Sequence, residues 1–209
     1  MSEEPSVYFA AVQATTGWDR VLETFADFCR VEAGWRVLDV GCGPGGLARH
    51  LEARACRTVG LDRDHPMAVL AAAAAGNRFR STRGDAQHLP FAGQGFDLVT
   101  ATNVMFLIDE PLAGVAEMAR VVRRGGRLAM LNPSERMSTD AATRLADERG
   151  LTGIERTSLL GWARAAEQRR RFSEEETRRL IEGAGCRILR QTTRIGAGLA
   201  RLTLAERVS

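Results

Sequence analysis

The sequence contains no lysine, so all 29 of its basic residues are arginine. This absence excludes a Schiff-base lysine nucleophile and the lysine of a phosphate-binding P-loop. Tyrosine is almost as scarce, with Tyr8 as the single example. The chain therefore lacks the Tyr–Lys pair on which short-chain dehydrogenases depend, and the composition argues against a hydride-transfer enzyme of that type.

Cysteine and histidine are few and scattered. The residues concerned are Cys29, Cys42, Cys56, Cys186, His50, His65 and His88. They form no C-x-x-C pair, and the histidines do not lie at metal-ligand spacing from the cysteines. We therefore expect neither a disulfide framework nor a metal site.

Long apolar runs are also missing. No uninterrupted stretch approaches the ~18 residues of a membrane-spanning helix. The acidic start, MSEEPSVYF, has no apolar segment of the kind found in signal peptides. We expect a cytoplasmic protein that does not enter membranes. With 209 residues, 44% of them hydrophobic, the chain is long enough for one domain with a substantial core.

The excess of positive charge is small. The 29 basic residues face 26 acidic ones, which gives a net charge of +3. Arginines alternate with acidic residues along most of the chain, and the one dense run, QRRR at 168–171, is explained at least as well by a solvated helix end. The expected partner is therefore a small molecule and not a nucleic acid, and we expect a monomer or a homodimer.

The chain is organised around residues 35–51, WRVLDVGCGPGGLARHL. Residues 37–40 have the apolar character of a buried strand. The glycines that follow allow positive φ and let the backbone approach a ligand closely. Residues 47–51 then resume with apolar residues four apart, as at the start of a helix whose free N–H groups face the turn. A strand, a glycine turn and a helix N-terminus in this order predict a nucleotide-type binding site.

Two ligands fit this pattern. Gly41, Gly43 and Gly46 have the G-x-G-x-x-G spacing of a dinucleotide fold, and Asp62 lies about 20 residues further on, where a ribose-binding acid belongs. Asp39, however, stands directly at the mouth of the strand, where a carboxylate would repel a pyrophosphate and attract an ammonium group. S-adenosylmethionine carries such a group on its methionine end, and it also has a ribose for Asp62.

The motif VLDVGCGPG resembles the first motif of the class I S-adenosylmethionine-dependent methyltransferases. The loop at 84–91, GDAQHLPF, is similar to that of the ubiquinone and menaquinone C-methyltransferase-like members, as is the run R-x-G-G before the fifth expected strand. The resemblance covers roughly residues 35–131. It implies S-adenosylmethionine as the cofactor and S-adenosylhomocysteine as the product.

The resemblance also implies roles for residues at successive strand ends. Asp39 would bind the methionine ammonium group, and Asp62 would accept hydrogen bonds from both ribose hydroxyls. Asp85, with Ala86, would lie at the adenine. The other candidate cofactor-binding residues are Gly41, Cys42, Gly43, Arg63, Met67, Thr102 and Asn103.

The elements expected from the pattern make an α/β fold. It is a Rossmann-like, seven-stranded, mostly parallel sheet with one reversed strand, helices on both faces, an N-terminal helix and a helical cap insertion. Strands are expected at 37–40, 58–61, 78–82, 98–101, 127–131, 186–192 and 197–205. Helices are expected at 12–31, from 47, at 67–75, 111–122, 141–149 and 158–170, and from the capping box at 173–176 to 183.

We interpret the chain as one domain, 1–209, with an N-terminal helical lid (1–33), a cofactor-binding core (34–132), a cap insertion (133–171) and a closing helix with two strands (172–209). In the lid, Tyr8, Phe9 and Trp18 are aromatic candidates for contact with the sulfonium cation. In the cap, the apolar residues expected to line an acceptor pocket are Met137, Leu159, Leu160 and Trp162.

The expected function is methyl transfer to a small molecule by in-line displacement. Because the donor is already activated, the protein mainly supplies position and excludes water. No catalytic residue is assigned: His88 is expected to face solvent or to pack in its loop, and Phe106-Leu107 stand where many similar enzymes carry a histidine pair. The alternatives are an RNA or protein methyltransferase and a non-catalytic S-adenosylmethionine-binding protein.

Overall fold

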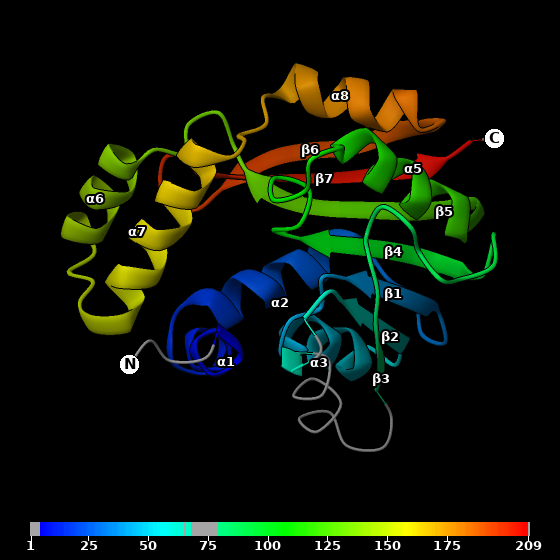
Figure 1. The fold of residues 1–209 in the computed structure, drawn as a ribbon, viewed down its shortest axis with the longest axis horizontal. Helices are drawn as coiled ribbons and strands as arrows, with labels where there is room; N and C mark the ends of the chain where they lie inside the picture. Colours follow the sequence, from blue (N-terminus) through cyan, green and yellow to red (C-terminus); the bar gives the residue numbers. More distant parts are fainter. Residues whose placement is uncertain (1–4, 65, 68–78, 209) are drawn as a thin grey trace.

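The described part of the chain folds around one seven-stranded sheet with the strand order β3-β2-β1-β4-β5-β7-β6 (Figure 1). The computed structural model describes residues 5–64, 66–67 and 79–208. The strands are β1 (Arg36–Val40), β2 (Arg57–Asp62), β3 (Arg80–Arg83), β4 (Phe96–Thr102), β5 (Val122–Pro133), β6 (Cys186–Arg194) and β7 (Ala200–Arg207). The helices are α1 (Pro5–Thr15), α2 (Trp18–Cys29), α3 (Gly46–Ala53), α5 (Pro111–Val121), α6 (Thr139–Glu148), α7 (Gly153–Gln168) and α8 (Glu174–Gly183).

The sheet is parallel except for one strand, as predicted. β1, β2, β3, β4 and β5 pair in parallel, whereas β7 is antiparallel to both of its neighbours, β5 and β6. Parallel neighbours need a crossover connection, but β6 and β7 follow each other through a short turn, which requires them to run in opposite directions. The carboxyl ends of β1, β2 and β4 therefore meet at one edge of the sheet, and the expected Rossmann-like fold is confirmed.

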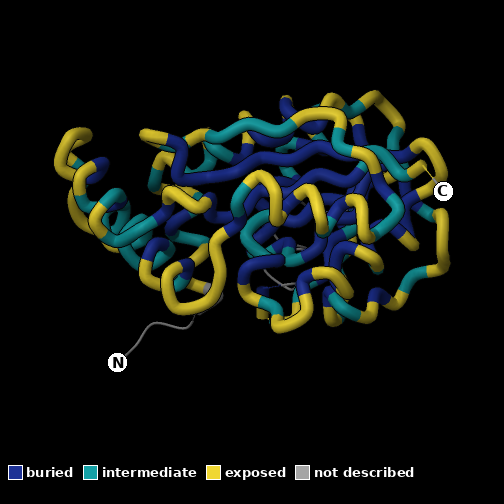
Figure 2. Tube along the Cα trace, turned by 90° about the horizontal axis from the view of Figure 1, so that it is seen from above, coloured by how far each residue is buried: buried dark blue, intermediate teal, exposed yellow. Residues whose placement is uncertain are grey.

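Helices cover both faces of this sheet because alternate strand residues point to opposite sides. Leu38, Val99 and Met130 belong to the core cluster that packs under α5 and α8. Their neighbours Val37 and Leu98 belong to a second cluster, which packs against α2 and α3. Figure 2 shows the buried strands in the middle of the molecule and exposed residues along the segments that surround them.

α1, the start of α2, α6 and α7 lie at the carboxyl end of the strands (Figure 1), and the rest of α2 packs on one face of the sheet. We call α1 and α2 the lid helices and α6 and α7 the cap helices. The sequence predicts one helix over 12–31, but the lid contains two, with a break at Thr16 and Gly17. The Thr16 Oγ1 accepts a hydrogen bond from the Trp18 N–H at 3.1 Å, and Gly17 is the N-cap of α2. A side chain that satisfies a backbone N–H outside the helix ladder competes with helix continuation, which accounts for the break.

Other predicted boundaries shift by a few residues. Both cap helices begin earlier than expected; α6 does so because Ser138 caps it, its Oγ accepting from the Ala141 N–H at 3.0 Å. The third strand, expected at 78–82, is β3 at Arg80–Arg83, and β5 is longer at both ends than the expected 127–131. The helix expected at 67–75 lies almost wholly outside the described residues.

The predicted capping box at α8 is present and can be tested. Ser173 Oγ accepts from the Glu176 N–H at 3.2 Å, while Glu176 Oε2 accepts from the Ser173 N–H at 2.8 Å. We expect Ser173→Ala to lower the free energy of unfolding by about 1 kcal/mol, because it removes a helix cap. The matched control is Thr152→Ala, since Thr152 is the N-cap of α7 but makes no side-chain capping bond. Urea unfolding of both variants checks this; equal losses would contradict it.

Candidate cofactor and acceptor site

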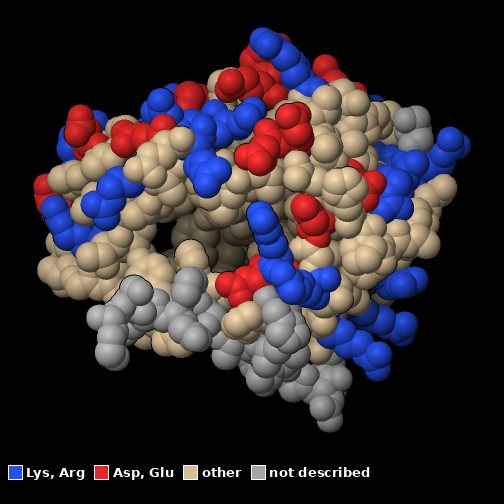
Figure 3. Space-filling view, viewed as in Figure 1, with Lys and Arg blue, Asp and Glu red and all other residues tan. Residues whose placement is uncertain are grey.

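A cavity of about 980 Å³ lies at the carboxyl ends of the strands, between the core, the lid helices and the cap helices. This volume is at the upper end of the range for small-molecule sites, so there is room for more than one ligand. Figure 3 shows the cavity as a hollow in this face of the molecule. All eleven cofactor-binding candidates from the sequence line it: Asp39, Gly41, Cys42, Gly43, Asp62, Arg63, Met67, Asp85, Ala86, Thr102 and Asn103.

The glycine turn between β1 and α3 forms one wall of the cavity. Gly41 and Gly43 have φ of 68° and 50°, in the left-handed region that favours glycine. The N–H groups of Gly41 and Cys42 both donate to the Leu61 carbonyl, at 2.7 and 3.1 Å, which ties the turn to the end of β2. A Cβ on Gly41 would lie 2.2 Å from Val104 Cγ2, so this position also lacks space for a side chain.

Asp39 is a buried carboxylate at the end of β1, only 2% exposed. Its Oδ1 accepts a hydrogen bond from Thr100 Oγ1 at 2.8 Å, and within the described residues Oδ2 has no donor. Burial raises the pKa of Asp39 to about 7, an effect that the Thr100 hydrogen bond opposes and the nearby Asp62 charge increases. A cation that reached this carboxylate would offset the energetic cost of its buried charge.

Asp62, at the end of β2, is held against the glycine turn. Its Oδ2 accepts from the Gly43 N–H at 2.8 Å and its Oδ1 accepts from the Asp64 N–H at 2.9 Å. Burial raises the pKa of Asp62, and these two backbone donors act in the opposite direction. Each carboxylate oxygen can accept more than one hydrogen bond, so Asp62 can accept from ligand hydroxyls while it keeps these two backbone donors.

The loop after β3 presents a third carboxylate. Asp85 Oδ1 accepts from the Gln87 N–H at 2.9 Å, and the Asp85 carbonyl accepts from the His88 N–H at 3.1 Å. Ala86 and Met67 are buried beside it, at 8% and 5% exposure, and add apolar surface to the wall. His88 is exposed and lies outside the lining of the cavity, as expected from the sequence.

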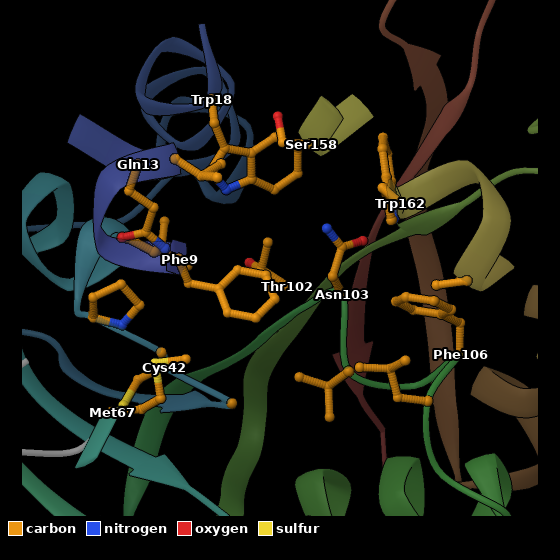
Figure 4. Close-up of a pocket in the computed structure, with 18 of the residues that line it drawn as sticks. Phe9, Gln13, Trp18, Cys42, Met67, Thr102, Asn103, Phe106, Ser158 and Trp162 are labelled. Carbon is orange, nitrogen blue, oxygen red and sulfur yellow. The ribbon is translucent and has the colours of Figure 1, made fainter. Parts of the chain in front are cut away.

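Four buried polar atoms on the cavity wall have no hydrogen-bond partner within the described part of the chain. They are Gln13 Oε1, Thr102 Oγ1, Asn103 Oδ1 and Trp162 Nε1. Leaving such a group unsatisfied costs about 1–3 kcal/mol, so a bound ligand or solvent is needed to complete the site. Figure 4 shows Thr102 and Asn103 in the floor of the cavity, between the lid residues and Trp162.

Cys42 contributes a small neutral side chain. It is 4% exposed, and burial together with the charges of Asp39 and Asp62 raises the pKa of its thiol far above the ordinary value. The thiol therefore stays protonated and adds no charge to the wall.

The lid and the cap meet over the cavity. Trp18 of the lid and Trp162 of the cap form an edge-to-face pair with ring centroids 5.6 Å apart. Nearby, Glu155 Oε1 accepts from the Gly17 N–H at 2.9 Å and so joins the start of α7 to the start of α2. Tyr8, Phe9 and Trp18, the aromatic residues predicted from the lid, all line the cavity.

The cap residues expected at the acceptor pocket divide into two pairs. Leu159 and Trp162 line the cavity, as predicted. The prediction is wrong for Met137 and Leu160, which lie outside its lining: Met137 is fully buried in the core cluster under α5 and α8, and Leu160 packs against the same cluster. The α7 residues that line the cavity are Glu155, Ser158, Leu159, Gly161, Trp162 and Ala165, without Leu160, and Met137 lies before α6.

Sequence reasoning missed several lining residues. Gln13 is the most informative, because its amide reaches the glycine turn and a Cβ on Gly46 would lie 2.4 Å from its Oε1. The available signal was its position as the one amide side chain in the uncharged helix α1, PSVYFAAVQAT. Ile195, in the turn between β6 and β7, also lines the cavity with a φ of 67°, but its place depends on tertiary structure and leaves no mark in the sequence.

In the described ranges 5–64, 66–67 and 79–208, histidine, cysteine, aspartate and glutamate side chains form no group of three or more that could hold a metal ion. None of the helices in these ranges is long and apolar enough to cross a bilayer. The four cysteines are separate buried thiols.

Residues 38–130 match the methyltransferase domain family. This part of the chain is similar to methyltransferase domains. The matched residues begin in β1 and end in β5, so they include the glycine turn and the carboxylates of Asp39, Asp62 and Asp85. The family therefore favours S-adenosylmethionine over the dinucleotide that the glycine spacing alone allows.

The curated relatives match this chain over part of their own length. Phosphatidylethanolamine N-methyltransferase from Cereibacter sphaeroides is 34% identical over 134 residues, which are 62% of this chain and 63% of that protein. The matched region spans between 37% and 63% of the length of the first three curated relatives.

Solved structures share the fold at low sequence identity. Magnesium protoporphyrin IX methyltransferase from Synechocystis, solved with bound S-adenosylhomocysteine, has a TM-score of 0.68 and 21% identity over 91% of this chain and 84% of that one. The cyclase SpnF has a TM-score of 0.70 and 17% identity over 91% of this chain and 81% of that one. A fold that a cyclase and a methyltransferase share does not by itself define the reaction, which has to be argued from the site.

Proposed function

We propose that this protein binds S-adenosylmethionine and transfers its methyl group to a small-molecule acceptor. The observation that carries the proposal is the convergence of Asp39, Asp62 and Asp85, from three successive strand ends, on one cavity beside the glycine turn. The methionine ammonium group, the ribose hydroxyls and the adenine amino group are all hydrogen-bond donors, so a set of carboxylates complements this ligand. A pyrophosphate would instead meet three like charges.

Each end of the cofactor has a place in this arrangement. We assign the ammonium group to Asp39, whose buried charge lacks a cationic partner, and the ribose to Asp62, which the Gly43 N–H holds in position. Asp85 and Ala86 would contact the adenine, with Met67 packing on the ring. The unpartnered Gln13 Oε1 adds an acceptor at the glycine turn, which suits the same donor-rich ligand.

When bound, S-adenosylmethionine supplies an activated methyl group, whose carbon forms a bond to an acceptor lone pair as the S–C bond breaks and leaves its electron pair on sulfur. This chain contributes by positioning the two reactants and by excluding water from the site. The lid and cap close over the site through the Trp18–Trp162 pair and the Glu155–Gly17 hydrogen bond. Alignment of the reactants can lower the barrier by about 7–11 kcal/mol, so the site does not depend on a strong base.

The shape and charge of the site favour a small molecule over RNA or protein. The cavity is lined by residues of the lid and the cap, and around the hollow in Figure 3 arginine side chains are mixed with acidic ones. A cytoplasmic location and a monomeric or homodimeric state stay predictions from the sequence.

Binding and turnover with Asp62→Asn test the proposal. We expect the wild-type protein to bind S-adenosylhomocysteine, and the variant to bind it about tenfold to a hundredfold more weakly, since hydrogen bonds to a charged group contribute about 1.5–3 kcal/mol. Calorimetry measures both affinities, with Asp27→Asn as the control because that carboxylate is exposed and pairs with Arg54 far from the cavity.

Turnover with a radiolabelled methyl donor and a panel of metabolites then separates an enzyme from a binding protein. Methyl transfer to a metabolite supports the proposal. Tight binding of S-adenosylhomocysteine without transfer to any member of the panel would contradict the methyl-transfer part. Tight binding of a nicotinamide dinucleotide with no uptake of S-adenosylhomocysteine would contradict all of it.

A further inference from the structure

We infer that the acceptor is a neutral, flat molecule whose hydroxyl group binds between Asn103 and Trp162. This inference rests on the proposed function, because it places the acceptor beside the bound cofactor and assigns Asn103, one of the cofactor-binding candidates from the sequence, to the acceptor instead. Asn103 follows β4 in the core, and Trp162 lies in α7 of the cap. Figure 4 shows the amide of Asn103 pointing into the space that Trp18, Ser158 and Trp162 border.

The two unpartnered atoms are complementary to a hydroxyl group. Asn103 Oδ1 accepts hydrogen bonds and Trp162 Nε1 only donates them, and both are buried without a partner in the described structure. A hydroxyl donates once and accepts, so it satisfies both atoms. An ammonium group has no lone pair for the indole N–H, and a carboxylate has no proton for the amide oxygen. Either ion would leave one buried atom unsatisfied.

The surrounding walls favour a flat apolar body. Aromatic rings from Phe9, Trp18, Phe106 and Trp162 line the cavity, together with aliphatic side chains such as Leu159. Rings of this kind pack on other ring systems in offset or edge-to-face arrangements, with centroids about 4.5–7 Å apart. The Trp18–Trp162 pair already has such geometry, which leaves ring faces and edges for a further planar group.

The carboxylates of Asp39, Asp62 and Asp85 lie at the strand ends of the cofactor half, and Glu155 is engaged with the Gly17 N–H. The other charged residues that line the cavity are Arg63, Asp64, Asp109, Arg149 and Arg169, of which all but Asp64 are exposed. The two buried atoms that we assign to the acceptor are neutral, so a charged group bound between them would lose its hydration without gaining an opposite charge from either.

The experiment compares four probes that share one ring system. β-Naphthol, naphthoic acid, naphthylmethylamine and naphthalene differ in a single substituent, and binding to the protein saturated with S-adenosylhomocysteine is measured by calorimetry. We expect β-naphthol to bind about tenfold or more tightly than each of the other three. Comparable or tighter binding of naphthoic acid or naphthylmethylamine would overturn the inference.

Single substitutions locate the hydroxyl. Trp162→Phe keeps the ring but removes the N–H, and Asn103→Gly removes the amide without adding strain at its φ of 58°. Each should weaken β-naphthol about fivefold to tenfold and leave the weaker affinity for naphthalene unchanged. Trp35→Phe is the matched control, because that indole lies under Arg127 outside the cavity. Unchanged β-naphthol affinity in both cavity variants would overturn the inference.

The same samples separate this inference from the proposed function. If the wild-type protein binds no S-adenosylhomocysteine, the proposed function fails, whatever the affinities of the four probes. If S-adenosylhomocysteine binds and β-naphthol does not bind more tightly than naphthalene, the proposed function stands and the acceptor inference fails.

Discussion

Replacing Asp39 with asparagine is expected to stabilise the ligand-free protein at about pH 8 while it weakens S-adenosylhomocysteine binding on the order of tenfold to a hundredfold. The two effects have one cause. Asp39 carries a buried charge that only the Thr100 hydroxyl contacts among the described side chains, and burial raises its pKa to about 7. Asparagine keeps an oxygen for Thr100 but has no charge to bury, and for the same reason it has none to offer an ammonium group.

The pH dependence follows from the direction of this shift. The pKa of Asp39 is 3.8 in the unfolded reference and about 7 in the folded protein, so between these values the unfolded chain has released a proton that the folded protein retains. Stability contributed by Asp39 is therefore lost as the pH rises from about 4 to about 7, and it stays low above that. Asp39→Asn removes this dependence, so its gain in unfolding temperature should be larger at about pH 8 than at about pH 5.

Ligand binding should have the opposite pH dependence. An ammonium group binds the ionised carboxylate, so the affinity of the wild-type protein should increase as the pH rises through about 7, whereas that of Asp39→Asn should stay flat. Thr100→Val provides a second variant: it removes the hydrogen bond that lowers the pKa of Asp39, and should move the wild-type profile to higher pH. Thermal unfolding and calorimetry at both pH values measure these effects. A destabilised Asp39→Asn protein with unchanged affinity would contradict the assignment.

The positions of Asp39 and Asp62 could be predicted because they depend on few steps. Each closes a short apolar run, and the carboxyl ends of neighbouring parallel strands meet at one edge of a sheet. The glycine turn is also local, since positive φ at Gly41 and Gly43 is a property of the residues themselves. The cofactor half of the site was therefore accessible from sequence, although binding by these residues still needs the experiments above.

The acceptor half could not be predicted as well, because it depends on how helices pack. α7 carries apolar residues on more than one side, and the sequence alone does not show that Trp162 lines the cavity and Leu160 does not. The break between α1 and α2 is equally hidden, since it depends on the Thr16 hydroxyl taking the Trp18 N–H. In both cases tertiary packing, and not the local sequence pattern, determines the structure.

Gly41→Ala is expected to be the most damaging single-methyl change in the cofactor half. The position has a φ of 68°, and the added Cβ would lie 2.2 Å from Val104 Cγ2. The left-handed backbone costs an alanine about 1–2 kcal/mol, and overpacking adds about 1–3 kcal/mol. We therefore expect the free energy of unfolding to fall by about 2–5 kcal/mol, a large part of the ~5–15 kcal/mol typical of a domain. Urea unfolding measures it.

Two further variants separate the backbone cost from the steric one. Gly34 has a φ of 86° and nothing within 4 Å of an added Cβ, so Gly34→Ala bears the backbone cost alone, about 1–2 kcal/mol. The double variant Gly41→Ala with Val104→Ala removes the clash. Its loss in the free energy of unfolding should equal that of Gly34→Ala plus the cost of truncating Val104. If Gly41→Ala and Gly34→Ala lose the same stability, Val104 moves aside freely and the steric argument is wrong. If the double variant regains stability but not S-adenosylhomocysteine affinity, the turn needs glycine for the approach of the ligand as well as for its fold.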